Sequence, residues 1–227
     1  MTTIAANLQA VRARIEVACV AAGRPTGSVR LLAVSKTWPV ECVADAVAAG
    51  QTAFGENYVQ EGVAKIQALA GNPALEWHYI GPLQSNKTRT VAENFAWVHT
   101  IDRLKIAQRL SEQRPPNLPP LQVCVQVNVS GEESKSGCTL KEAVTLAHAV
   151  VALPRLTLRG LMAIPEPSED PMRQREQFAV LRHFRDTLDL ELDTLSMGMS
   201  HDLEAAIMEG STLVRIGTAI FGERQYA

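Results

Sequence analysis

The order of predicted elements indicates an α/β protein, a (β/α)₈ TIM barrel with an extra N-terminal helix. Eight short apolar or β-branched runs alternate with helical patterns along the chain. This alternation is typical of parallel βαβ units, which form either a closed barrel or an open doubly wound sheet. The count of eight, and the lack of a glycine-rich fingerprint after the first run, favour the barrel. The 227 residues also exceed the lower size limit of such barrels, which is roughly 200 residues.

The opening helix is predicted from apolar residues at helical spacing. Its stripe consists of Leu8, Val11, Ile15 and Ala18. We expect residues 1–27 to form this helix and its connection, packed on a single domain that spans 1–227. No repeat, low-complexity tract or charge run divides the chain, and the proline-rich segment 114–120 is short enough to be a loop.

The eight strands are predicted where β-branched or apolar residues cluster. In order, they are 31–35, 52–54, 76–80, 95–99, 121–128, 156–161, 192–195 and 212–216. The helices between them are expected in 39–49, 59–70, from about 85 onward, 103–113, 140–151, about 178–188 and 201–208. Pro39 suits the first turn of its helix, and Gly50 ends that helix.

Two of these helices have apolar stripes that predict which face is buried. The stripe of the helix 59–70 is Val59, Val63, Ile66 and Ala70. The stripe of the helix 140–151 is Leu140, Val144, Ala147 and Val151. Both follow the spacing of an amphipathic helix, so we expect these side chains to face the strands.

Composition excludes several classes of function. Lys and Arg number 22 against 24 Asp and Glu, so the basic excess of a general nucleic-acid binder is missing. No apolar run approaches the roughly 20 residues of a membrane span. The four cysteines form no C-x-x-C pair, which argues against zinc ribbons and thioredoxin-like motifs. The charged opening segment is unlike a signal peptide, so we expect reduced thiols and a cytoplasmic location.

Ligand sites of such barrels lie at the carboxyl ends of the strands. Polar residues, glycines and a single lysine concentrate among the residues that follow the predicted strands. They are Lys36, 55–57, Gly81, Asn128, 162–165, 196–200, Gly217 and Thr218. We therefore expect the site among them.

Lys36 ends the apolar run LLAVS at the predicted barrel mouth. Partial desolvation there disfavours the charged ammonium, and the neutral amine is the form that attacks an aldehyde. A lysine that is only a solvated strand end is the alternative. The position therefore indicates a candidate nucleophilic amine.

The loops after the seventh and eighth strands suit a phosphate. The segment 196–201 offers serine hydroxyls and a glycine just before a short helix, whose amino end attracts anions. Ser200 is alternatively only the N-cap of that helix. Gly217 and Thr218 follow the neighbouring strand, and barrel phosphates often lie between these two loops.

Two other motifs fail on chemistry. Ser200, His201 and Asp202 are consecutive, so their side chains project in different directions and cannot act as a catalytic triad. The segment 81–88 resembles a P-loop, but Asn86 replaces the second glycine, where the backbone must approach phosphate closely.

Long segments of the chain resemble one family. They are LLAVSKTWP, FGENYVQE, WHYIGPLQSNKTR, VNVSGEESKSG, GLMAIP and LSMGMSHDLEAAIMEGSTLVRIGTAIFG. Together they resemble the pyridoxal 5′-phosphate (PLP) homeostasis protein family, which is similar to the barrel domain of alanine racemase. The resemblance implies that PLP, a form of vitamin B6, is the cofactor. It also implies eleven cofactor-binding residues: Lys36, Asn57, His78, Met162, Ser196, Met197, Gly198, Ser200, Arg215, Gly217 and Thr218.

The resemblance gives these residues different roles. Lys36 would form the Schiff base with PLP, and the loop 196–200 with Gly217 and Thr218 would hold the phosphate. Arg215 would face the pyridine nitrogen. The residues that would line the rest of the pocket are Asn57, His78 and Met162.

The role implied for Arg215 bears on catalysis. A cationic arginine beside the pyridine nitrogen disfavours its protonation, so the ring becomes a poorer electron sink. A racemase also needs a second base, which a second domain and a partner subunit help to supply in alanine racemase. We therefore predict a PLP carrier or buffer without substantial catalysis of its own. The alternative is a PLP-dependent amino-acid racemase or decarboxylase of the same fold.

The expected partners follow from this interpretation. PLP itself is one, and PLP-dependent apo-enzymes that receive it are another; neither nucleic acid nor a membrane is expected. Lys135, in the segment SKSG, is a candidate second lysine for transfer. The protein is expected to be a monomer or a weak dimer.

Overall fold

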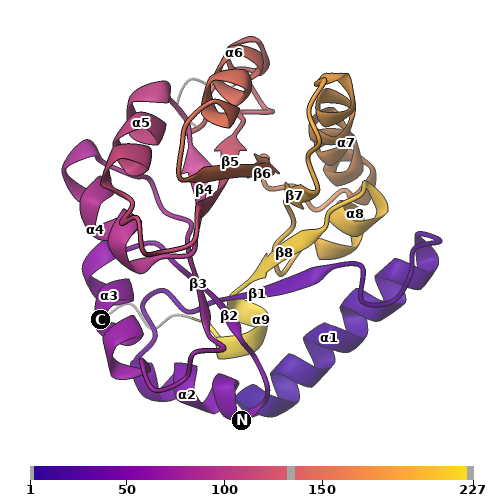
Figure 1. Ribbon diagram of the computed structural model, residues 1–227. Coiled ribbons are helices and arrows are strands. Elements are labelled where there is room, and N and C mark those ends of the chain that lie inside the picture. Colours follow the sequence, from indigo (N-terminus) through magenta and orange to yellow (C-terminus); the bar gives the residue numbers. More distant parts are fainter. Residues whose placement is uncertain (1–2, 132–135, 224–227) are drawn as a thin grey trace.

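The computed structural model describes residues 3–131 and 136–223. Eight parallel strands pair in sequence order and close into one barrel, with β1 hydrogen-bonded to both β2 and β8 (Figure 1). The strands are β1 (Arg30–Val34), β2 (Ala53–Glu56), β3 (Glu76–Tyr79), β4 (Trp97–Ile101), β5 (Leu121–Gln126), β6 (Leu156–Met162), β7 (Thr194–Ser196) and β8 (Leu213–Ile216). The predicted fold class is confirmed.

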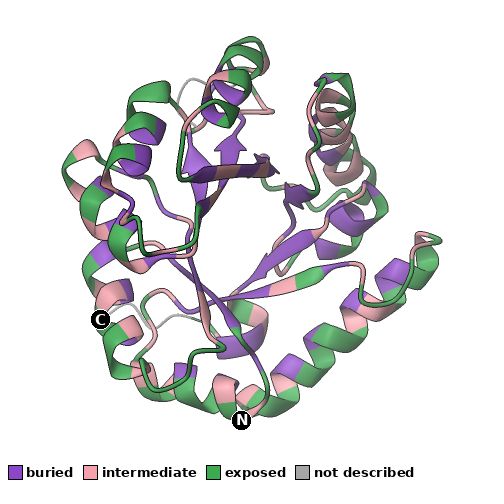
Figure 2. Ribbon diagram, in the orientation of Figure 1, coloured by how far each residue is buried: buried purple, intermediate pink, exposed green. Residues whose placement is uncertain are grey.

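Helices surround the barrel, and their inner faces are buried while their outer faces are exposed (Figure 2). They are α1 (Ile4–Ala21), α2 (Val40–Ala48), α3 (Val59–Ala68), the 3₁₀ turn η1 (Ser85–Lys87), α4 (Thr88–Asn94), α5 (Leu104–Gln113), α6 (Leu140–Val151), α7 (Pro171–Thr187), α8 (Leu203–Met208) and α9 (Thr218–Phe221). The sequence patterns did not predict α9. No helix within the described residues is long and apolar enough to cross a membrane.

Helix α1 lies along the outside of the barrel, beside α2 and α8 (Figure 1). All four residues of its predicted stripe are buried. Polar contacts fix its position. Arg14 pairs with Glu204 on α8, and Arg24 donates to the carbonyl oxygens of Ile207 and Ser211 at 2.9 and 2.7 Å.

The predicted faces of α3 and α6 are only partly confirmed. In α6 the buried residues are Ala143, Leu146, Ala147 and Val150. The side chains of Val144 and Val151 are exposed. Ala147 of the predicted stripe is buried and Leu140 is half-buried, but the rest of the buried face is displaced by one position along the helix.

Helix α3 buries Val59, Gly62 and Lys65. Predicted core residues Val63 and Ile66 are half-buried, and Ala70 is exposed. A lysine replaces an apolar residue on this face because it meets a buried carboxylate, as described below.

Side chains from alternate strand positions fill the barrel in layers, as the period of two requires. The lower layer, at the amino ends, includes Arg30, Glu76 and Trp97, which line a cavity. The upper layer, at the carboxyl ends, includes Val34 and Ile80, which line another. A middle layer of buried residues separates the two cavities.

Candidate functional site

A cavity of about 200 Å³ lies at the carboxyl ends of the strands. It is lined by Val34, Lys36, Asn57, Ile80, Ile164, Met199, Ser200, His201, Arg215, Gly217 and Thr218. A neighbouring cavity of about 270 Å³ shares four of these residues: Asn57, Ile80, Ile164 and Met199. The structure therefore brings together Lys36, Asn57, Ser200, Arg215, Gly217 and Thr218 from the predicted set.

Lys36 lies just beyond β1, and both of its neighbours are held in place. The Ser35 carbonyl oxygen accepts a hydrogen bond from Nζ of Lys65 at 2.7 Å. The Thr37 backbone N–H donates to Oε1 of Glu61 at 2.6 Å. Thr37 has a φ of 68°, a left-handed conformation that costs energy for a β-branched residue. The contacts on either side fix the backbone from which the Lys36 side chain projects.

These contacts belong to a buried ion cluster, here called the clamp, formed by Glu56, Glu61 and Lys65. Nζ of Lys65 lies 2.8 Å from Oε1 of Glu56 and 2.5 Å from Oε1 of Glu61. The Ser35 hydroxyl also donates to Glu56 at 2.6 Å. Burial raises the pKa of Glu56, although the charge of Lys65 opposes the shift. The cluster explains why a lysine occupies the inner face of α3.

Arg215 reaches the cavity from β8 and is itself buried. Its Nη1 donates to the backbone oxygen and the hydroxyl of Ser196 at 2.5 and 2.7 Å, and Nη2 donates to the Ala163 oxygen at 2.9 Å. Burial lowers the pKa of Arg215 to about 10. The guanidinium is therefore still a cation at neutral pH, held by neutral acceptors.

The loops after β7 and β8 meet at one side of the cavity. The Ser200 hydroxyl accepts a hydrogen bond from the Ala219 backbone N–H at 3.3 Å, which joins the two loops. Ser200 is not the N-cap of the short helix, because Asp202 occupies that position. A Cβ at Gly217 would lie 3.3 Å from the Val34 oxygen, so a side chain there would crowd β1. Hydroxyl groups and a glycine backbone thus face the same space.

Asn57 carries unmet hydrogen-bonding capacity. Its Oδ1 is buried and has no hydrogen-bond partner among the described residues. A Cβ at Gly81 would lie 2.3 Å from the Asn57 backbone oxygen, so only glycine allows the two segments to pack this closely. A buried amide oxygen without a partner is costly, which marks Asn57 as a residue that a bound ligand would satisfy.

Five residues of the predicted set do not line this cavity: His78, Met162, Ser196, Met197 and Gly198. The register explains the difference. His78 and Met162 belong to the middle layer, and the residues two positions further along, Ile80 and Ile164, line the cavity instead. Alternation along each strand would have found Ile80 and Ile164 from the sequence. Lys135 lies outside the described residues.

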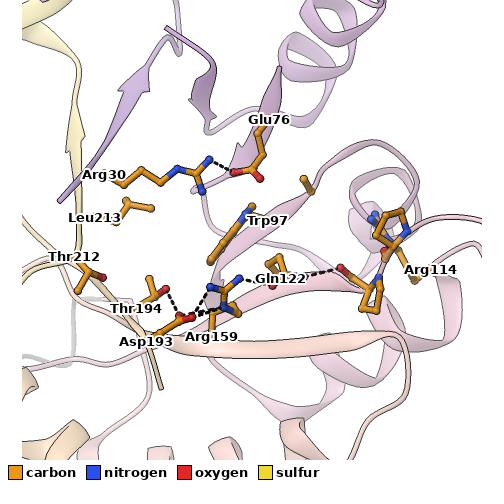
Figure 3. A pocket seen from close by; sticks show the side chains of 13 residues that line it. Arg30, Glu76, Trp97, Arg114, Gln122, Arg159, Asp193, Thr194, Thr212 and Leu213 are labelled. Carbon is orange, nitrogen blue, oxygen red and sulfur yellow. Dashed lines mark hydrogen bonds and ion pairs between the residues drawn. The ribbon is translucent and has the colours of Figure 1, made fainter. Parts of the chain in front are cut away.

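The amino ends of the strands carry a larger cavity, of about 570 Å³ (Figure 3). Arg30 points at Glu76, with 2.5 Å between Nη2 and Oε1, and Arg159 pairs with Asp193. Trp97 lies between the two ion pairs, with the Arg159 guanidinium 5.2 Å from its ring centroid. Four charges of this cavity thus form two ion pairs, and the fifth, on Arg114, is held by backbone carbonyl oxygens.

Fold and site together define a (β/α)₈-barrel protein whose polar site follows the first, seventh and eighth strands. Residues 6–225 match the family model described as alanine racemase, N-terminal domain. The chain belongs to the pyridoxal phosphate homeostasis protein family. It is 62% identical over 226 residues to the protein of that name from Pseudomonas aeruginosa, covering 100% of this chain and 98% of the relative. The Escherichia coli K12 protein is 57% identical over 232 residues, covering 100% and 99%.

Solved structures give a consistent comparison. PipY of Synechococcus elongatus PCC7942, solved with PLP bound, is 35% identical and superposes with a TM-score of 0.85, over 97% of this chain and all of PipY. Alanine racemase of Clostridium difficile 630 is 16% identical with a TM-score of 0.72, over 97% of this chain and 56% of the enzyme. The second likeness concerns the fold alone.

Proposed function

We propose that this protein binds PLP at the carboxyl ends of its strands and takes part in PLP homeostasis as a carrier or buffer. The observation that carries the proposal is one cavity that combines an amine, a guanidinium, two hydroxyl groups and a buried amide oxygen, which has no partner in the described part of the chain. The names of the relatives and the PLP in the PipY structure support the same ligand.

The residues present suit this cofactor. PLP, when bound, supplies an aldehyde that a lysine amine can hold covalently and a ring that withdraws electrons. Lys36 is the amine on the cavity, and the clamp fixes the backbone on both sides of it. Ser200, Gly217 and Thr218 would hold the phosphate, because their hydroxyl and backbone groups face the same space.

Arg215 supports a role without substantial turnover. Its guanidinium stays cationic at neutral pH and lines the cavity. A cation beside the pyridine nitrogen keeps that nitrogen unprotonated, which weakens the ring as an electron sink. Arg215 would therefore favour storage of the cofactor over carbanion chemistry on an amino acid.

His201 is the residue on which a catalytic alternative would depend. The charged or titratable side chains that line the two adjoining cavities, within the described part of the chain, are Lys36, His201 and Arg215. A racemase needs two bases, so Lys36 would have to act together with the exposed His201. A His201→Ala variant therefore belongs in the test.

The deciding experiment is an amino-acid panel assayed for racemisation, decarboxylation and transamination by PLP-loaded protein, with Lys36→Ala as the blank. We expect no rate above the blank, and the same result for His201→Ala. A rate in the ordinary enzyme range, about 1–10³ per second, would overturn the carrier role. Transfer of bound PLP to an apo-enzyme, faster than from free PLP at equal concentration, is the positive result expected.

A further inference from the structure

A line of hydrogen bonds crosses the barrel interior from the lower cavity to the upper one. Glu76 Oε1 lies 2.8 Å from His78 Nε2, and His78 Nδ1 lies 2.9 Å from His99 Nε2. His99 Nδ1 lies 2.8 Å from the Ser196 hydroxyl, to which Arg215 Nη1 donates at 2.7 Å. These five residues are here called the relay. They belong to strands β3, β4, β7 and β8.

The two ends of the relay determine its direction. A guanidinium can only donate, and a carboxylate can only accept. Glu76 therefore accepts from Nε2 of His78, and Arg215 donates to the hydroxyl oxygen of Ser196. When both imidazoles are neutral, Nδ1 of His78 accepts from Nε2 of His99, and Nδ1 of His99 accepts the Ser196 proton. In this neutral state every donor points toward Glu76, and each ring carries its proton on Nε2.

Burial supports this protonation state. Burial lowers the pKa of His78 to about 4, although the hydrogen bond to Glu76 opposes the shift. Burial, then the charge that His78 would carry when protonated and the charges of Arg215 and Arg30, hold the pKa of His99 well below its ordinary value. Burial alone would raise the pKa of Glu76, but contacts with His78 and Arg30 lower it to about 2. At neutral pH the relay thus has one cation, one anion and neutral groups between them.

The groups packed around the two rings leave them little freedom. Trp97 stacks on His78, with ring centroids 5.2 Å apart and planes 9° apart, and its ring lies 5.7 Å from that of His99. The nearby charged groups are Arg30, which is paired with Glu76, and Arg159, which lies over Trp97. Both imidazoles are fully buried. A flipped ring would therefore leave buried nitrogens without partners, which is costly.

We propose that Glu76, His78 and His99 are positioning residues for Arg215. By accepting the Ser196 proton, His99 fixes the orientation of this hydroxyl, so that a lone pair of its oxygen faces Arg215. Among the described residues Arg215 forms no ion pair, so this oxygen and the carbonyls of Ser196 and Ala163 hold its cation in place. The relay thereby links the carboxylate in the lower cavity to the guanidinium in the upper one. Its role toward PLP rests on the proposed function.

The first test needs no cofactor. Nitrogen-15 NMR of the histidine rings in the wild-type apo-protein, assigned with His78→Gln and His99→Gln variants, reads the tautomers directly. We expect both rings to carry the proton on Nε2 and to remain neutral at pH 6. A proton on Nδ1 of either ring, or a protonated ring at that pH, would overturn the relay whether or not the protein binds PLP.

The second test measures PLP. Ser196→Ala removes the junction at Arg215, and Glu76→Leu removes the terminal acceptor; Asp193→Asn is the matched control, because it neutralises a carboxylate of the same lower cavity outside the relay. We expect the first two to raise the PLP dissociation constant about tenfold, as expected for one hydrogen bond to a charged group. Ser196→Ala and Glu76→Leu should also shift the pH at the midpoint of the bound-cofactor absorbance change. Asp193→Asn should change neither the dissociation constant nor this midpoint.

The outcomes separate the two proposals. Wild-type affinity for PLP and an unshifted pH midpoint in both Ser196→Ala and Glu76→Leu would overturn the positioning role. Glu76→Gln, which keeps an acceptor for His78, should retain the wild-type tautomers, and their loss would contradict the assigned direction. A wild type with the expected tautomers that fails to bind PLP would overturn the proposed function, and the role of the relay toward PLP with it.

Discussion

The cavity at the amino ends of the strands holds about 570 Å³, and the one at the carboxyl ends about 200 Å³. In the larger cavity Arg30 pairs with Glu76, and Arg159 pairs with Asp193. In the smaller cavity the buried Oδ1 of Asn57 has no partner among the described residues. Among the described residues, a buried side-chain oxygen without a hydrogen-bond partner thus lines the upper cavity, and none lines the lower one.

This difference separates a structural cavity from a ligand site better than volume does. A polar group that is already paired gains little from a ligand, because binding only exchanges one partner for another. A buried polar group without a partner gains a new hydrogen bond from the ligand and gives up none. On the proposed function, the ion pairs of the lower end help to hold the barrel together, and the upper end binds the ligand. The variants below compare changes at the upper end or in the middle layer with a matched change elsewhere in the molecule.

The largest effect is expected at Lys36. Lys36→Ala should abolish covalent PLP incorporation, seen as loss of the visible absorbance band and of the labelled peptide after borohydride reduction. Arg159→Ala removes a cation from the lower cavity and should leave both signals intact. Full incorporation at another lysine in Lys36→Ala would break the assignment.

The next largest effect is expected in the clamp. Lys65→Met leaves the buried carboxylate of Glu56 without its cation, and removing one partner of a buried pair costs about 3–5 kcal/mol. Arg159→Met breaks the partly exposed pair with Asp193 and should cost less than about 1 kcal/mol. Urea unfolding of both variants measures the difference. Equal losses would show that the clamp is no more important to stability than a surface ion pair.

The pH dependence of stability tests the middle layer. The folded-state pKa of His78 is lowered to about 4, so between pH 6.5 and 4 the unfolded chain binds a proton that the folded chain does not. The free energy of unfolding should therefore fall as the pH drops through this window, by about 3 kcal/mol from His78 alone. His78→Gln should flatten the profile, whereas His148→Gln, on an exposed face of α6, should not. A wild-type profile without this slope would contradict a neutral buried imidazole.

The fold was predictable because it depends on a coarse pattern. Alternating apolar runs and helical stripes indicate a barrel even when strand ends are off by a few residues. Finer features could not be predicted from the sequence, because they depend on which residues pack against each other in the fold. Val144 and Val151 have the right spacing for a buried face, but the neighbouring positions Ala143 and Val150 are the buried ones. From the sequence alone, Lys65 would be placed on the surface, because no local pattern shows that Glu56 lies opposite it.

The site was predictable where chain position alone decides it. Lys36, Gly217 and Thr218 follow strands and therefore reach the barrel mouth. His78 was placed on the cavity by family resemblance, yet its position two residues before Ile80 puts it one layer lower. No local pattern indicates the relay, because His78, His99 and Ser196 meet only after the barrel has closed.

The smallest of these effects is expected at Gly217, and it tests whether the upper cavity holds an anion. Gly217→Glu should weaken PLP binding about thirtyfold, because the new carboxylate repels the phosphate and its Cβ crowds the Val34 oxygen. Gly217→Ala, which adds the Cβ alone, separates crowding from charge. Gln122→Glu adds the same charge to the lower cavity, beside Arg159, and should leave the affinity unchanged. PLP titration followed by absorbance measures all three.

Because Gly217 has a negative φ that any residue adopts, both variants at this position should fold. Wild-type affinity in folded Gly217→Glu would place the phosphate elsewhere, and an equal loss in Gln122→Glu would mean that the two ends respond alike to charge.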